Sequence, residues 1–116
     1  MNREWGSSMS AFNTVHFRGP CPTCRAVVPL VVQFKYGDCY QHKYAIGEAL
    51  RWGGNDVGRP EARWVVVDGA GESCTRCGSD SDFYVFISAD HISSVESTSD
   101  IYDFVSSSDS FIVLEP

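Results

Sequence analysis

Alternating apolar and polar positions along the chain predict a series of short β-strands. The clearest candidate strands are Phe12 to Arg18, Val27 to Tyr36, Arg63 to Asp68 and Asp82 to Ser88. The last of these carries apolar side chains on both faces, which is typical of a central strand that is covered on two sides. The pattern therefore predicts a mostly β fold built on an antiparallel sheet.

The segments between these strands are interpreted from their turn residues. Gly37-Asp38 interrupts the second candidate strand and Tyr40 to Ile46 is β-rich again, so residues 27–46 are expected to form a hairpin. Pro29 has no N–H to donate, which predicts an edge position or a bulge. Gly47 to Trp52 is too short to distinguish a helical turn from a strand, and the glycine-rich residues after it are expected to form a loop.

The last quarter of the chain has a weaker pattern. His91 to Val95 predicts one more strand, and Phe111 to Leu114 predicts a short strand at an edge of the sheet. Between them, Asp100 is suited to cap a single short helical turn that ends at Val105.

The length of 116 residues fits one domain, and an apolar content of 43% is enough to build a core. We expect residues 1–10 to be a flexible leader, residues 11–96 to form the β domain and residues 97–116 to form an acidic, Ser- and Asp-rich C-terminal extension. No secretory segment is recognised, and no apolar stretch approaches the roughly 20 residues that cross a bilayer. The expectation is a cytoplasmic protein that does not contact a membrane.

Four of the five cysteines form two Cys-x-x-Cys pairs, Cys21-Pro-Thr-Cys24 and Cys74-Thr-Arg-Cys77. Two intervening residues allow a tight turn to direct both sulfurs toward one point, and zinc prefers four such ligands in a tetrahedron. Pro22 suits the first turn, and Gly78 gives the second turn a permissive backbone, where the first has Arg25. We therefore predict that one structural Zn²⁺ is bound by Cys21, Cys24, Cys74 and Cys77.

Three other interpretations of the cysteines stay open. The same four sulfurs could hold iron for electron transfer, act as redox dithiols, or form two disulfides. The doubled spacing favours zinc, and a cytosolic setting disfavours disulfides. A closed shell of four sulfurs leaves no coordination position for a substrate, which disfavours metal-dependent hydrolysis.

The two knuckles resemble those of the zinc-ribbon, or rubredoxin-like, superfamily, in which Cys-Pro-x-Cys, a β-sheet insertion and Cys-x-x-Cys-Gly follow one another. Three further strings resemble small uncharacterised zinc-ribbon proteins of bacteria: Gln33 to Gly37, Tyr44 to Gly47 and Trp52 to Gly58. The resemblance implies a zinc-ribbon fold and one structural metal ion, and it implies no activity.

Other candidate ligands and catalytic groups are weaker. Cys39 and His42 have a Cys-x-x-His spacing with no second pair to complete a site, so a free thiol and an ordinary histidine are expected there. No Ser-His-Asp order, phosphate-binding loop or dinucleotide fingerprint is recognised. The sequence therefore predicts no enzyme.

Charge is distributed unevenly along the chain, whose formal net charge is −6. Residues 1–45 carry five basic and two acidic side chains, whereas residues 46–116 carry four basic and thirteen acidic ones. A negative field repels phosphate backbones and attracts basic partners.

These features favour a non-enzymatic, structural-zinc-binding domain that binds a protein partner with a basic surface, as an immunity or antitoxin-like protein does. One alternative is a nucleic-acid-associated zinc ribbon of the transcription or translation machinery. Its phosphate contacts would come from Arg18, Arg25, Lys35, Lys43 and Arg76. A second alternative is a rubredoxin-like electron carrier.

Overall fold

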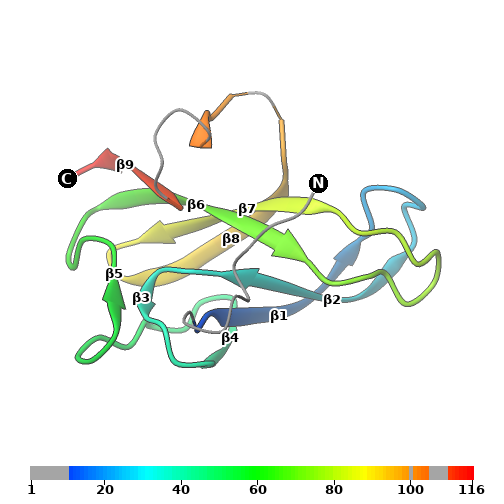
Figure 1. Cartoon of the computed structure of the whole chain (residues 1–116). Helices are drawn as coiled ribbons and strands as arrows, with labels where there is room; N and C mark the ends of the chain where they lie inside the picture. The colour runs from blue at the N-terminus through cyan, green and yellow to red at the C-terminus, as the bar shows by residue number, and fades with distance from the viewer. Residues whose placement is uncertain (1–10, 100, 105–109) are drawn as a thin grey trace.

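The computed structural model describes residues 11–99, 101–104 and 110–116. The leader predicted for residues 1–10 lies outside these ranges, as do both ends of the helical turn predicted for Asp100 to Val105. The described residues form nine strands (Figure 1). The strands are β1 (Asn13–Pro20), β2 (Val27–Phe34), β3 (Gly37–Asp38), β4 (Lys43–Ala45), β5 (Asp56–Val57), β6 (Trp64–Gly71), β7 (Asp82–Ser88), β8 (His91–Ser97) and β9 (Phe111–Glu115).

Most of the chain forms one curled sheet with the strand order β4-β1-β2-β6-β7-β8, and β9 pairs with β6. All neighbouring strands in this sheet are antiparallel except β1 and β4, which are parallel. The short strands β3 and β5 form a separate two-stranded sheet. The predicted mostly β fold is confirmed. Within the described residues, no helix has the length and apolar character needed to cross a membrane.

The hairpin predicted for residues 27–46 is wrong. β2 pairs with the preceding strand β1, from Asn13 opposite Phe34 to Pro20 opposite Val27, and β4 pairs with β1 in parallel. The reason lies in the Asn13 side chain, which is fully buried. Its amide donates to two carbonyls after β2 and accepts from two N–H groups before β4, so it holds this connection across the start of β1.

The edge position predicted from Pro29 is found at Pro29 itself, although β2 as a whole lies inside the sheet. Pro29 pairs with Arg18 of β1 on one side. On the other side, β6 pairs with β2 only from Val32 to Phe34. The missing N–H of Pro29 therefore falls where β2 has a single neighbouring strand.

The sheet curls because β6 changes partners along one side. Trp64 to Val67 pair with β9, whereas Gly69 to Gly71 pair with β2. A Cβ atom on Gly69 would lie 2.7 Å from Val32 Cγ1, closer than packed side chains tolerate. Glycine here therefore permits the close approach of β2 to β6 at the bend.

Curling brings the segment after β4 against β8, at the opposite edge of the sheet. Gly47 N–H donates to the Ile92 carbonyl at 2.7 Å, and Ile92 N–H donates back to the Glu48 carbonyl at 2.9 Å. Leu50 N–H donates to the Asp90 carbonyl at 2.7 Å. These bonds close one end of the curled sheet, which we call the closed end.

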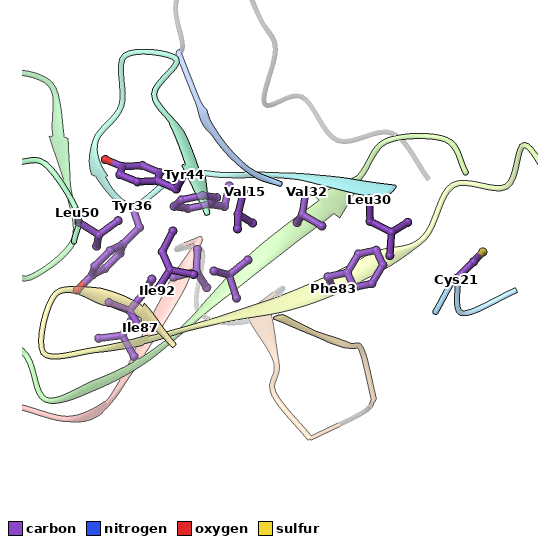
Figure 2. Packing of buried hydrophobic residues seen from close by; sticks show 14 of the residues in the cluster. Val15, Cys21, Leu30, Val32, Tyr36, Tyr44, Leu50, Phe83, Ile87 and Ile92 are labelled. Atoms are coloured by element: carbon purple, nitrogen blue, oxygen red, sulfur yellow. The ribbon is translucent and has the colours of Figure 1, made fainter. Parts of the chain in front are cut away.

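Alternate side chains of the long strands fill the interior of the curl (Figure 2). A second apolar cluster covers the outer face of β6 and β7, where Val66, Tyr84 and Phe86 are buried. Tyr102 and Phe104 pack on this outer face. The prediction that β7 is central and apolar on both faces is confirmed, and so is the edge strand predicted near the end of the chain, which is β9.

Candidate metal centre

The two Cys-x-x-Cys pairs lie in the turns of two hairpins. Cys21 and Cys24 are in the turn between β1 and β2, and Cys74 and Cys77 are in the turn between β6 and β7. Because β2 and β6 are neighbours in the sheet, the two turns project from the same end of the molecule (Figure 1). We call this the cysteine end.

Each turn directs backbone N–H groups at its first cysteine sulfur. Thr23 N–H donates to Cys21 Sγ, and Arg76 N–H donates to Cys74 Sγ, both at 3.4 Å. Donors at this position favour the thiolate, which is the form that binds a metal. The first pair and the second pair thus form the same local structure from different sequences.

Both turns end with a residue in the left-handed backbone conformation. Gly78 has φ 75°, and Arg25 takes the equivalent place with φ 65°. Arg25 N–H donates to the Cys21 carbonyl at 2.8 Å, and Gly78 N–H donates to the Cys74 carbonyl at 2.9 Å. The first turn therefore has the same shape as the second, but its left-handed conformation is less favourable because Arg25 has a Cβ atom.

The structure brings together all four cysteines that the sequence predicted as ligands. Their sulfur atoms lie within 4.8 Å of one another, with 3.8 Å between Cys21 and Cys77 and 3.9 Å between Cys24 and Cys74. Zn–S bonds of about 2.3 Å in a tetrahedron place the sulfurs about 3.8 Å apart. The same separations exceed a disulfide bond of about 2.05 Å, and all four cysteines are free thiols. The cluster is thus a candidate metal site with the size that a zinc ion requires.

The thiols of Cys77 and Cys24 differ in acidity. Hydrogen bonds from the Ser79 backbone and side chain lower the pKa of Cys77 to about 6. The Ala26 backbone N–H lowers the pKa of Cys24, but partial burial and the nearby sulfurs of the other cysteines together raise it to about 11. Four thiolates at this spacing repel one another, and a divalent cation at their centre would relieve that repulsion.

The site is continuous with the main core. Cys21 and Cys74 are buried and belong to the interior cluster, whereas Cys77 is exposed. Figure 2 shows Cys21 at one end of the row of interior side chains, beyond Leu30 and Phe83. A metal ion here would join the two hairpin turns and cover that end of the core.

Cys39 and His42 form no comparable site. Cys39 is a buried free thiol whose Sγ lies 3.4 Å from the Gly37 carbonyl oxygen, and burial raises its pKa to about 11. His42 Nε2 lies 2.8 Å from Asp38 Oδ2 instead. The hydrogen bond with His42 and a second one from Asn55 N–H lower the pKa of Asp38. Among the described residues, the four-cysteine cluster is the one group of three or more His, Cys, Asp or Glu side chains arranged to hold a metal.

The polar network around Asn13 and Asp38 was missed by the sequence analysis. Asn13 shares the inward-facing register of β1 with Val15, and a polar residue in that register could have indicated a buried hydrogen-bonded side chain. The interactions of Asp38 with Asn55 depend on contacts between distant loops, and no local pattern indicates them.

Searches of protein-family models, of curated proteins and of solved structures found no match to this chain.

Proposed function

We propose that this chain is a non-enzymatic domain of the zinc-ribbon type, in which one structural Zn²⁺ joins two β-turns, and that the domain binds another protein. The observation that carries the proposal is the convergence of four sulfurs within 4.8 Å from turns about fifty residues apart. Two structurally equivalent Cys-x-x-Cys turns around one point are typical of a structural zinc site.

The closed shell supports a structural rather than a catalytic metal. A tetrahedral ion held by Cys21, Cys24, Cys74 and Cys77 has no open position for water or substrate. The ion would then contribute folding free energy by fixing the two turns, and the rest of the chain would supply the binding surface.

Metal analysis tests this part of the proposal. The purified chain is expected to contain one zinc per molecule and to lose stability when a strong chelator removes it. A coloured, iron-containing protein would instead support the electron carrier, and a chain purified without metal that resists chelator unchanged would refute a structural metal.

A basic protein partner is supported by where the acidic side chains lie. Several carboxylates are used as local caps: Asp56 accepts from Gly53 and Gly54 N–H, and Asp90 accepts from Glu61 N–H. Others gather at the cysteine end, where Glu72 and Asp80 line a hollow of about 540 Å³ beside the second turn. The carboxylates of this hollow would attract a basic surface, as in an immunity or antitoxin-like protein that covers a basic toxin.

Charge reversal tests the partner hypothesis. The variant Glu72→Lys/Asp80→Lys is compared with Glu61→Lys/Glu115→Lys, which makes the same change in net charge away from the hollow. In affinity capture from host cells, the first variant is expected to lose the partner protein that the unmodified chain captures. The second variant is expected to retain it. Equal capture by both variants would remove the electrostatic basis of the proposal.

A further inference from the structure

A groove of about 470 Å³ lies between β1 and β8, next to the first cysteine turn. Phe17, Phe83 and Val95 form its apolar floor, while Pro20 of β1 and Ser97 of β8 lie on opposite sides. At the closed end, by contrast, residues 47–50 bond to Asp90 and to Ile92 of β8. The groove is therefore the gap left where the curled sheet stays open.

Among the described residues, the β1 side of the groove is a strand edge without a pairing partner. β4 pairs with β1 only from Thr14 to His16. Thr14 N–H donates to the His42 carbonyl, on the β4 side, whereas Cys21 N–H donates to the Ala26 carbonyl, on the β2 side. Backbone groups alternate in direction along a strand, so those of Arg18 point away from β2, to the side of β1 on which the groove lies.

The β8 side is a second strand edge to which no other described residue pairs beyond Ile92. Thr98 N–H donates to the Asp82 carbonyl, which shows that even-numbered positions here face β7. The N–H and C=O groups of Val95 and Ser97 therefore face the other way, toward the groove. The segment after β4 bonds to β8 at Ile92 and does not extend along this part of the strand.

The two edges run in the same direction. β1, β2, β6, β7 and β8 are each antiparallel to the next, so β1 and β8 are parallel to each other. A single added strand can consequently run antiparallel to both edges at once. Its two sets of alternate amides would then bond to β1 and to β8, and its alternate side chains would reach the apolar floor.

We propose that this groove binds an extended segment of a partner protein by β-strand addition, with apolar side chains at alternate positions of the segment directed at Phe17, Phe83 and Val95. The inference rests on the proposed protein-binding function and specifies the kind of partner surface. An extended backbone is the occupant that matches two rows of peptide donors and acceptors.

The charged side chains on the outer faces of β1 and β8 add a preference for orientation. Arg18 is exposed on the outer face of β1, and Glu96 is exposed on the outer face of β8. Cross-strand pairs of opposite charge stabilise a sheet, so the outward side chains of the segment should be acidic beside Arg18 and basic beside Glu96.

The test uses a library of fluorescein-labelled peptides of about seven residues, the length of a typical strand. Val, Ile or Phe alternates with Ser, Thr, Lys or Glu, and binding to the zinc-loaded full chain is followed by anisotropy. At least one member is expected to bind with a Kd below about 1 mM. N-methylation of either set of alternate amides in that peptide should weaken binding by more than about tenfold.

Two proline variants address the strand edges themselves. Ser97→Pro and Arg18→Pro each remove one N–H that faces the groove and spare the bonds to β7 and β2. Each proline variant should raise the Kd of the selected peptide by more than about tenfold. The controls Ser97→Ala and Arg18→Ala should keep a Kd within about threefold of that of the unmodified chain. Zinc content and thermal midpoint of each variant report whether it is folded. Amide exchange of the unmodified chain gives a second readout, with peptide-induced protection expected at Val95 and Ser97.

The inference is overturned if no library member binds, if the proline variants bind the peptide as well as the alanine controls, or if protection appears elsewhere. A dimer in solution that Ser97→Pro converts to a monomer would also overturn it, because the occupant would then be a second copy. If capture of a partner protein depends on Glu72 and Asp80 but not on Ser97, the groove is not the binding site. The proposed protein-binding function would still be supported.

Discussion

The two ends of the curled sheet are held by different kinds of interaction. At the closed end, backbone hydrogen bonds join Gly47 and Glu48 to β8 and Leu50 to Asp90 just before it. The buried Asn13 amide makes four hydrogen bonds to the connection between β2 and β4. At the cysteine end, no strand pairing joins the edges of β1 and β8 within the described residues. Four sulfurs from two turns meet there instead.

This difference shows how a small β domain can stay open at one end. A polar network such as that of Asn13 forms from groups that the chain itself supplies, so the closed end should fold without a cofactor. The sulfurs of the cysteine end repel one another as thiolates, so that end should depend on a cation. Stability at the two ends should therefore respond to different perturbations.

The largest effect is expected from removing one sulfur. Cys74→Ser should lose the metal and lower the free energy of unfolding by more than about 4 kcal/mol, because both turns lose their common anchor. Urea unfolding measures this loss, and hydrogen exchange should show the cysteine end opening before the closed end.

Cys39→Ser is the matched control, since Cys39 is also a buried free thiol but lies outside the cluster. It should keep one zinc per chain. Equal metal loss in both variants, or full metal content in Cys74→Ser, would contradict the assignment.

The next largest effect concerns the closed end. Asn13→Ala leaves two N–H groups and two carbonyls without their side-chain partner and should cost about 3 kcal/mol. Because Asn13 is the first residue of β1 and Cys21 follows the other end of that strand, zinc stoichiometry should not change. Urea unfolding and metal analysis measure the two quantities, and Thr14→Ala serves as a neighbouring control. Loss of zinc in Asn13→Ala would show that the two ends are coupled.

A smaller, graded effect is expected from pH, because protons and metal compete for the same sulfurs. At pH 7 the Cys77 thiol, with a pKa of about 6, is largely ionised, whereas Cys24, with a pKa of about 11, must lose its proton on binding. Zinc affinity should therefore fall as pH falls, by about tenfold per pH unit for each proton displaced. The slope should steepen below the Cys77 pKa of about 6. Competition titrations with a chromogenic chelator measure the zinc affinity at each pH. A zinc affinity independent of pH would exclude thiolate ligation.

The regular parts of the fold could be predicted because their causes are local. β1 follows from alternating apolar residues, whereas β6 and β7 follow from short runs of β-branched and aromatic residues. Each was predicted within about two or three residues of its observed bounds. The convergence of the cysteines was also predictable, since doubled Cys-x-x-Cys spacing restricts the partners that four sulfurs can have.

The rest depended on contacts between distant segments. The parallel pairing of β4 with β1 follows from the Asn13 hydrogen bonds, and the groove between β1 and β8 follows from where the curl of the sheet stops. The pattern of apolar and polar residues along the chain indicates neither the pairing of β4 with β1 nor the groove. The first cysteine turn is an intermediate case: its sequence showed a departure at Arg25, and the backbone shows what that departure costs.

The smallest effect compares the two turns directly. Arg25 has a left-handed φ of 65°, and Gly78, which has no side chain, has a φ of 75° at the equivalent position. The left-handed conformation costs a residue with a Cβ about 1 kcal/mol relative to glycine. Arg25→Gly should therefore raise the free energy of unfolding by up to about 1 kcal/mol, reduced by the extra freedom of glycine in the unfolded chain. Gly78→Ala should lower it by a similar amount, because a Cβ there meets no atom within 4 Å and backbone strain alone remains. Thermal unfolding of the zinc-loaded variants measures both changes. If Arg25→Gly destabilised the domain instead, the arginine side chain would have to contribute more than its backbone costs, and the two turns would no longer be equivalent supports for the metal.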